Sequence, residues 1–454
     1  MTPTSAGLSG TFPLSSRVNE RGHLEIGGCD ALELAAQFGT PAYIVAEDDL
    51  RARARAFLHG LRGRHPDSDV LFGSKAFPCT AVYRVLADEG LSCDVASGGE
   101  LALALRAGFE PGRIYLHGNA KSEQEIREAM LAGVGHIVLD SEDDLVAVES
   151  VAASLGVVQE VLIRVTPDVA GDTHHAISTG QADSKFGFGL AQARTAIARV
   201  HAARHLRMAG LHCHIGSQLL ELEPFRAAIA ALAELGEFEV YNLGGGLGVA
   251  YNAGDDPPAL GDYLATVVDT AHRLLGSGKR LLLEPGRALV ANSTVTLYTV
   301  RTVKRNVSTW VAVDGGMSDN LRPMLYGSVY EAVIADRPLA RGGEPCRLAG
   351  KHCESGDVLI RELVLEDPRP GDVVVTPATG AYCHAMANNY NGAPRPPVVF
   401  CSRGTARLVV RRETYDDLMS RDLDTLRQDG ETIGPDRETA SRDLDTQQEG
   451  DAGA

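Results

Sequence analysis

The stretch DVLFGSKA at residues 69–76 is an apolar run that ends in a polar, charged tip. Seven further runs of this kind follow it, and stretches of helical composition, rich in Ala, Leu, Glu and Arg, separate most of them. Eight strands that alternate with crossover helices can close into a parallel barrel. The sequence therefore predicts an α/β fold built on a TIM-type (β/α)8 barrel. The other seven runs cover residues 91–97, 113–118, 136–141, 160–167, 208–217, 238–246 and 280–287.

Each of the eight runs ends in charged, polar or glycine residues. The reactive groups of a parallel barrel gather at the C-terminal ends of its strands, so these tips would share one rim. We therefore expect an active site at this rim. The tip residues are Lys75, Asp94, His117, Asp140, Arg164, His214, Gly244–Gly246, Glu284 and Arg287.

The bulk composition is that of a globular protein with more than one domain. The chain has 454 residues, of which 44% are hydrophobic and 23% are charged, and it is too long for one ordinary core. No apolar run reaches the length of about 18 residues that spans a membrane, and residues 1–16 lack the features of a secretory signal. The eight cysteines form no CxxC pair, which argues against a disulfide framework and makes the cytoplasm the expected compartment. The net charge of −17 disfavours nucleic acid as a partner.

The composition and the hydrophobic pattern of the sequence change along the chain and suggest four parts. Residues 1–40 combine hairpin-like and helical material and are expected to pack on a later β-domain, and residues 41–290 hold the barrel pattern. Residues 291–420 contain closely spaced β-branched runs, which predict an all-β domain. Residues 421–454 are acidic and poor in apolar side chains, as in a disordered tail. The β-type runs of the third part are 294–303, 310–313, 358–365, 372–376, 397–401 and 406–410.

Two of the rim motifs suit an aldehyde cofactor that bears a phosphate. Lys75 is flanked by Ala76 and Phe77, which would desolvate its amine in part, as a Schiff-base lysine requires. The loop after the seventh run, YNLGGGLG at 241–248, presents consecutive backbone N–H groups that can cradle a phosphate. The alternatives are a lysine that merely reaches solvent from a strand end and a plain tight turn.

Two further rim motifs supply a carboxylate, a guanidinium group and two imidazoles. The sequence EPGR at 284–287 could pair Glu284 with a pyridinium proton and Arg287 with a carboxylate or phosphate, although a buried ion pair is the alternative. The sequence HCHIGSQ at 212–218 places two imidazoles on one face of a strand. Two ligands are too few for a zinc site, so we prefer His214 stacked on a flat cofactor, with Ser217 donating to a phosphate.

Three motifs lie in connections of the predicted β-domain. Cys353 stands among His352, Glu354 and Asp357, so it is unlike an inert apolar filler and could react. A second connection carries Arg322 and Tyr326, which suit a substrate carboxylate, and a third adds the hydroxyl of Tyr382. Because these loops of the β-domain carry so many reactive and charged side chains, we expect the site to lie between domains or between subunits.

Taken together, these motifs resemble those of the diaminopimelate decarboxylases, which are pyridoxal-phosphate enzymes with the alanine racemase-like fold. The similarity extends over about residues 17–418. The resemblance implies a barrel that binds pyridoxal 5'-phosphate, a C-terminal all-β domain, and decarboxylation of meso-2,6-diaminopimelate to L-lysine and CO2, the last step of lysine biosynthesis. The motifs are HxHIGSQ at 212–218, NLGGG at 242–246, EPGR at 284–287, CESGD at 353–357 and GAY at 380–382, with ISTG at 177–180 and KFG at 185–187.

The resemblance also implies roles for individual residues. Lys75 would hold the cofactor as a Schiff base, His214 would stack on its ring, Glu284 would pair with its nitrogen, and Asp94 would support the site. Cys353 would protonate the carbanion, reaching with Glu354 into the barrel of a partner in a head-to-tail homodimer. The remaining cofactor contacts would be Ser217, Gly244, Gly245, Gly246, Gly286, Arg287 and Tyr382, and the substrate contacts Arg287, Arg322, Tyr326, Glu354 and Tyr382.

The residue types agree with a substrate that carries two amino-acid ends. Arg322 offers a cation for the distal carboxylate and Glu354 an acid for the distal amine, whereas an ornithine or lysine decarboxylase would need only the acid. Asn119-Ala-Lys-Ser122 departs from the Asn-Asn-Lys-Ser of the family, which leaves room for a related amino acid such as ornithine, lysine or arginine, or a carrier-bound substrate. An amino-acid racemase, a non-catalytic scaffold and a zinc enzyme are the more distant alternatives.

Overall fold

Eight parallel strands form a closed barrel in the computed structural model, which describes residues 7–169, 184–340 and 342–423. Their order around the barrel is β10-β11-β12-β5-β6-β7-β8-β9. Each expected run overlaps one of these strands, so the predicted barrel is confirmed. The strands are β5 (Ser68–Gly73), β6 (Ser92–Val95), β7 (Ile114–Leu116), β8 (His136–Leu139), β9 (Gln159–Val165), β10 (Leu206–Cys213), β11 (Val240–Asn242) and β12 (Arg280–Leu283).

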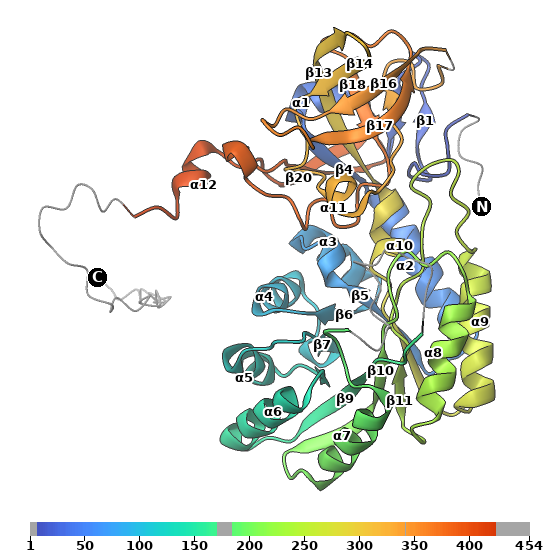
Figure 1. Cartoon of the computed structure of the whole chain (residues 1–454), viewed down its shortest axis with the longest axis vertical. Helices are drawn as coiled ribbons and strands as arrows, with labels where there is room; N and C mark the ends of the chain where they lie inside the picture. The colour runs from blue at the N-terminus through green and yellow to red at the C-terminus, as the bar shows by residue number, and fades with distance from the viewer. Residues whose placement is uncertain (1–6, 170–183, 341, 424–454) are drawn as a thin grey trace, which may run out of the picture. The chain divides into compact units, whose positions relative to one another are not determined.

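Helices connect the barrel strands and surround them (Figure 1). Three consecutive crossover helices, α4 to α6, begin at a serine whose side chain accepts a backbone N–H, and each ends at a left-handed glycine. These caps explain why the chain turns sharply after each strand tip. The helices are α2 (Glu47–Arg62), α3 (Thr80–Asp88), α4 (Gly98–Ala107), α5 (Glu123–Ala132), α6 (Glu142–Leu155), α7 (Leu190–Ala202), α8 (Glu223–Ala233), α9 (Leu260–Leu274) and α10 (Arg287–Val290), with short 3-10 turns at Ser74–Ala76, Pro111–Arg113 and Ala291–Ser293.

An apolar layer fills the barrel interior beneath the strand tips. Leu71, Tyr115, Val138 and Leu162 contribute to it together with residues of β10, β11 and β12. The strands are buried on both faces, as is usual when helices cover a parallel sheet. The polar side chains at the strand tips therefore lie above an apolar layer that fills the barrel interior.

The second sheet has nine strands and forms the predicted all-β domain. Its main order is β17-β16-β14-β13-β4-β19-β20, with β18 paired to β13 and to β15. The barrel was expected to begin near residue 41, but β4 (Ala42–Ala46) lies between β13 and β19 of this sheet, so that boundary was wrong. Its fully buried apolar pattern also fits a central strand of a sheet. The other strands are β13 (Thr294–Arg305), β14 (Thr309–Val313), β15 (Val333–Ile334), β16 (Glu344–Ala349), β17 (Val358–Leu365), β18 (Val373–Thr376), β19 (Val398–Ser402) and β20 (Thr405–Val410), and the short helix α11 (Arg322–Tyr326) and the 3-10 turn Tyr390–Gly392 lie in connections.

The N-terminal segment packs on the β-domain. It holds a three-stranded sheet of β1 (Arg17–Val18), β2 (Leu24–Ile26) and β3 (Cys29–Asp30), followed by α1 (Ala31–Phe38). Its apolar side chains share one core cluster with strands β4, β13, β18 and β19. The segment is thus an integral part of the β-domain core.

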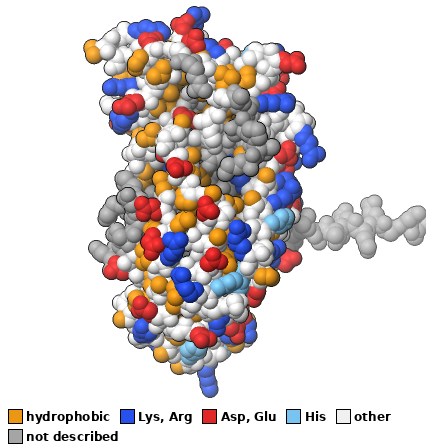
Figure 2. All heavy atoms as spheres, turned by 90° about the vertical axis from the view of Figure 1, so that its right-hand side faces the viewer, with side chains coloured by type: hydrophobic (Ala, Val, Ile, Leu, Met, Phe, Trp, Pro, Cys, Tyr) orange, Lys and Arg blue, Asp and Glu red, His pale blue; other side chains and the backbone are white. Residues whose placement is uncertain are grey.

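The compact unit that contains the barrel and the β-domain ends at Glu413, earlier than the expected limit of residue 420. Beyond it, α12 (Tyr415–Met419) begins with a capping box between Thr414 and Asp417. The predicted tail, residues 421–454, lies almost entirely outside the described residues. Acidic and basic side chains are interspersed over the face in Figure 2. Among the residues that the structure describes, no helix is both long and apolar enough to cross a membrane.

Candidate active site

A cavity of about 280 Å³ lies at the C-terminal ends of the barrel strands. It brings together residues that the sequence analysis selected from six separate segments of the chain. The barrel rim is therefore a site in three dimensions, as the strand tips predicted. The selected residues that line it are Lys75, Asp94, His214, Ser217, Gly246, Glu284, Gly286, Arg287 and Tyr382.

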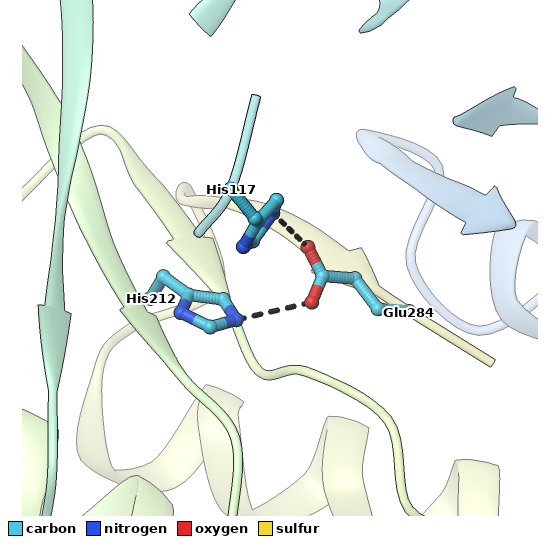
Figure 3. Close-up of side chains that lie close together, drawn as sticks. All are labelled: His117, His212 and Glu284. Carbon is cyan, nitrogen blue, oxygen red and sulfur yellow. Dashed lines mark hydrogen bonds and ion pairs between the residues drawn. The ribbon is translucent and has the colours of Figure 1, made fainter. Parts of the chain in front are cut away.

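Glu284 is buried at the tip of β12 and is held by three side chains, of which Figure 3 shows His117 and His212. Nε2 of His212 lies 3.0 Å from Oε2, Nε2 of His117 lies 2.9 Å from Oε1, and Asn242 donates to Oε1 at 2.6 Å. Burial alone would raise the pKa of Glu284, but His117 and His212 hold it well below its usual range. Burial lowers the pKa of His212 to about 4, so this imidazole is neutral and donates its N–H. The result is an oriented carboxylate rather than a Glu–Arg ion pair.

The same three residues could be read as a metal site, because their ligand atoms lie within 4.8 Å of one another. However, each imidazole nitrogen approaches a different carboxylate oxygen at hydrogen-bond distance (Figure 3). The amide of Asn242 approaches one of these oxygens as well. This geometry fixes the carboxylate by hydrogen bonds and does not aim all three groups at a common centre.

Lys75 lies in the 3-10 turn that follows β5. Its neighbours Ala76 and Phe77 are buried, but the Lys75 side chain is exposed, so the expected desolvation by these neighbours is wrong. The backbone N–H of Ser74 donates to Asp94 at 3.2 Å, which ties the lysine turn to the tip of β6. Burial and the nearby Glu284 raise the pKa of Asp94 to about 7. The amine therefore opens into the cavity beside a carboxyl group that titrates near neutral pH.

The glycine-rich loop after β11 has two functions. Gly244 and Gly245 are close-packed turn residues: a Cβ on Gly244 would lie 2.2 Å from the carbonyl oxygen of Cys213, and the N–H of Gly245 donates to Nδ1 of His214 at 3.2 Å. Only Gly246 of the three lines the cavity. Burial and the cations Lys75 and Arg164 keep the pKa of His214 well below its ordinary value. The loop thus positions a neutral imidazole and exposes one backbone segment to the cavity.

Arg287 and Tyr382 close the cavity from the two domains. Nη2 of Arg287 donates to Oγ of Ser217 at 2.8 Å, and its Cζ lies 4.9 Å from the centroid of the Tyr382 ring. The N–H of Tyr382 donates to the carbonyl oxygen of Ala76 at 2.8 Å, which connects the β-domain to the lysine turn. Burial would raise the pKa of Tyr382, but Arg287 and Lys75 lower it. A Cβ on Gly380 would lie 1.8 Å from the carbonyl oxygen of Val290, so the GAY loop requires glycine there.

Besides Gly244 and Gly245, four of the selected residues lie outside this cavity. Arg322 is buried, donates to the hydroxyl of Tyr330, and lies against other side chains of the β-domain, and Tyr326 is half-buried at the end of α11. Cys353 and Glu354 are exposed. The cavity of one chain therefore contains the groups selected for the cofactor but lacks the thiol and the acid selected for the substrate.

The loop that carries Cys353 has a defined shape although its tip is exposed. The carboxylate of Asp357 accepts the N–H groups of His352 at 2.9 Å and of Met317 at 2.7 Å. The amide oxygen of Asn391 accepts the N–H of Cys353 at 3.0 Å. These bonds hold the thiol outward, away from the core of its own domain.

The sequence reasoning gave no role in the site to several residues that line the cavity or support it. His117 and Arg164 were noted only as strand tips, and Asn242 only as part of the glycine-rich motif. Their positions at the ends of β7, β9 and β11 were the available signal. Phe186 lines the cavity from a loop and offered no such signal. The expected motif at residues 177–180 lies outside the described residues.

Comparisons with known proteins agree with this geometry. Residues 47–291 match the pyridoxal-binding domain of the pyridoxal-dependent decarboxylases. The chain is 47% identical over 438 residues to a diaminopimelate decarboxylase of Actinosynnema pretiosum subsp. auranticum, covering 93% of this chain and 98% of the relative. It is 43% identical over 426 residues to the diaminopimelate decarboxylase of Bacillus subtilis, covering 90% and 97%.

Solved structures give the same result. A diaminopimelate decarboxylase from M. jannaschii superimposes with a TM-score of 0.85 at 33% identity, covering 90% of this chain and 98% of that one. A diaminopimelate decarboxylase from Helicobacter pylori, complexed with L-lysine, superimposes with a TM-score of 0.81 at 30% identity, covering 86% and 98%. The similarity thus includes the β-domain as well as the barrel.

Proposed function

Because the chain belongs to the diaminopimelate decarboxylases, a pyridoxal-phosphate-dependent family of carboxy-lyases, we propose that the barrel-rim cavity is where it carries out that reaction. The protein removes CO2 from meso-2,6-diaminopimelate and releases L-lysine, the last step of lysine biosynthesis. The observation that carries the proposal is the cavity itself, where Lys75 and His214 lie with a carboxylate, Glu284, that two imidazoles and an amide orient.

The residues of the cavity fit pyridoxal phosphate. Arg287 is buried and, among the described residues, has hydroxyl and aromatic partners but no carboxylate within ion-pair distance. A buried cation of this kind suits an anionic group at the cavity, and Ser217 and the backbone of Gly246 would hold the cofactor phosphate beside it. Glu284 would face the pyridine nitrogen and His214 its ring. Lys75 would bind the aldehyde carbon.

The bound cofactor supplies a conjugated sink for the electron pair that remains when CO2 departs. Glu284 serves this chemistry by keeping a proton on the ring nitrogen, which is why its low pKa matters. His212 and His117 hold that carboxylate in place, and Asp94 supports the lysine turn through the N–H of Ser74. Lys75 would hold the cofactor and would give up that place to the substrate amine.

We place the proton donor on a second copy of the chain. Cys353 and Glu354 are exposed and lie outside the cavity of their own chain, on a loop that Asp357 and Asn391 hold outward. In a head-to-tail homodimer, Cys353 would deliver a proton to the α-carbon after CO2 leaves. Glu354 would then meet the distal amine of the substrate. The cytoplasm is the compartment that fits such an enzyme.

We assign substrate specificity to the residues that would bind the distal carboxylate and the distal amine of diaminopimelate. Arg287 and Arg322 would receive the distal carboxylate, with Tyr326 and Tyr382 as hydroxyl partners. Glu354 would pair with the distal amine. An ornithine or lysine decarboxylase has no use for the buried arginine of α11, because its substrate lacks the second carboxylate.

The direct test is release of CO2 and L-lysine from meso-diaminopimelate by the purified, pyridoxal-phosphate-loaded protein, with ornithine, lysine and arginine in parallel. Equal amounts of lysine and CO2 from diaminopimelate alone would support the proposal. Turnover of one of the other three amino acids instead would overturn the assigned substrate while leaving the fold and cofactor intact.

The shared site is tested by mixing two inactive variants, Lys75→Ala and Cys353→Ala. Subunit exchange should restore up to about a quarter of wild-type activity, because a mixed dimer has one complete site of its two and random exchange yields half mixed dimers. Exchange is monitored with differently tagged chains. Proven exchange without any recovery would contradict a site built from two copies.

A further inference from the structure

Two buried arginines of the compact unit lack an acidic partner. Arg287 of the barrel is 5% exposed and Arg322 of the β-domain is 4% exposed. Among the described residues, no carboxylate lies within ion-pair distance of either guanidinium, and Nε of Arg322 is buried without a hydrogen-bond partner. A buried charge is costly unless it is paired, so these two cations are arranged to meet an anion from outside the chain.

One side chain contacts both arginines. Tyr251 is buried in the loop that follows the glycine-rich turn, and its hydroxyl accepts a hydrogen bond from Nη1 of Arg287. Its ring lies under Arg322, with 4.4 Å between the guanidinium carbon and the ring centroid. The Cζ of Arg287 lies 5.6 Å from the same centroid. Tyr251 is therefore wedged between the cation of the barrel and the cation of the β-domain.

The position of Tyr251 is itself fixed on both sides. The carboxylate of Asp255 accepts its backbone N–H at 2.8 Å, and the ring of Tyr330 packs edge-on against it at 5.2 Å between centroids. Tyr330 also accepts a hydrogen bond from Nη1 of Arg322. A rigid aromatic ring in this position sets the separation and orientation of two like charges that would otherwise repel each other.

We propose that Tyr251 is a positioning residue. It aligns the guanidinium groups of Arg287 and Arg322 so that both bind the distal carboxylate of the substrate. The hydroxyl fixes Arg287, and the ring face fixes Arg322. The inference rests on the proposed function, because the anion it invokes is the second carboxylate of the substrate. It goes beyond that function in making selectivity for a dicarboxylate depend on a residue that does not itself touch the carboxylate.

Two substitutions separate the two contacts. Tyr251→Phe keeps the ring under Arg322 and removes the acceptor of Arg287, while Tyr251→Leu removes both. Tyr115→Phe is the matched control, since it removes a buried tyrosine hydroxyl from the barrel interior, where the ring stacks on His136. All three are prepared as holoenzymes, and circular dichroism and thermal melting check their folding.

The readouts are the KM and kcat for meso-diaminopimelate and the calorimetric binding of two smaller ligands. L-lysine retains the distal carboxylate, and 1,5-diaminopentane lacks it. Tyr251→Phe should raise the KM for diaminopimelate about tenfold, as expected for a lost hydrogen bond to a charged group. Tyr251→Leu should raise it about tenfold further, because the cation–π contact is lost too. Affinity for L-lysine should fall by similar factors, because its carboxylate is the distal one that remains after CO2 leaves. Affinity for 1,5-diaminopentane should change by less than about twofold in both variants, because it has no carboxylate for the two arginines to contact.

The outcomes distinguish this inference from the proposed function. If wild-type protein fails to bind and decarboxylate diaminopimelate, the proposed function is wrong. If wild-type protein is active but Tyr251→Phe matches Tyr115→Phe in its diaminopimelate KM, the inference is wrong. Equal losses of L-lysine and 1,5-diaminopentane affinity would also overturn it, since they would indicate general damage. Should Tyr251→Leu not fold, the Phe variant alone decides.

Discussion

The two ends of the barrel each contain a histidine with a depressed pKa, and the two histidines differ in their surroundings. His212 lies near the C-terminal end of β10 and His136 begins β8 at the opposite end, and burial lowers the pKa of each to about 4. Each also approaches a glutamate at 3.0 Å. A depressed pKa and a carboxylate partner are therefore common to both ends and do not by themselves mark a site.

The difference lies in what surrounds each pair. Glu284, the partner of His212, is buried and shares its oxygens with His117 and Asn242 at the edge of a cavity. Glu160, the partner of His136, has a side chain that is 31% exposed, and the imidazole stacks flat on Tyr115. One end holds a carboxylate ready to meet a ligand, and the other seals the barrel. The position of a His–Glu pair at the C-terminal end of the strands is what distinguishes a functional pair from a structural one.

The largest effect should come from comparing lysines at the two ends. Lys75→Ala should lower kcat/KM by about 10⁴-fold or more, because it removes the amine that binds the cofactor. Lys279→Ala, at the start of β12, should stay within about twofold, since its amine only pairs with Glu237 at 3.1 Å. Steady-state kinetics and the absorbance of bound cofactor measure both. Comparable losses in the two variants would remove the distinction between the ends.

The glutamates give a finer comparison. Glu284→Gln should lower kcat about 10³-fold, because an amide cannot hold a proton on the pyridine nitrogen. Glu160→Gln should leave kcat nearly unchanged, although it also removes the carboxylate partner of an imidazole, that of the half-buried His136. Cofactor content, measured for both variants, shows whether a lower kcat reflects lost chemistry or lost binding. A Glu284→Gln enzyme with full cofactor and near-normal kcat would contradict the role of this carboxylate.

The barrel could be predicted because its signals are local. Each strand is a short apolar run with a polar tip, and each helix from α4 to α6 begins at a serine and ends at a glycine. Most of the cavity could be predicted for the same reason, since strand tips of a parallel barrel must meet at one end. His117 and Asn242 were identifiable as tips, but their shared partner Glu284 follows only from three-dimensional packing.

The features that escaped prediction depend on contacts between distant segments. β4 precedes the barrel in sequence but pairs with β13 and β19, whose residues come some 250 positions later or more. Tyr251 lies in a loop without any motif, and its contact with Arg322 joins two domains. The exposure of Lys75 could not be read from Ala76 and Phe77, because neighbours in sequence do not define the walls of a cavity.

The smallest predicted effect concerns stability at the closed end of the barrel. His136 is neutral in the folded protein, with a pKa of about 4, and would titrate near its ordinary value when unfolded. The unfolded chain therefore binds more protons as the pH falls from about 6.5 to about 4, so stability is full above this window and is lost within it. The shift corresponds to about 3 kcal/mol from this one group.

His136→Phe keeps a ring against Tyr115 and removes the titration, so its denaturation midpoint should fall less between pH 7 and pH 4.5 than that of the wild type. His59→Phe, at an exposed position of α2, is the matched control and should retain the wild-type acid sensitivity. Activity at pH 7 should be unaffected by either change. An unaltered acid sensitivity in His136→Phe would mean that the acid lability arises elsewhere, with His212 at the open end as the next residue to test, because its pKa is depressed by burial in the same way.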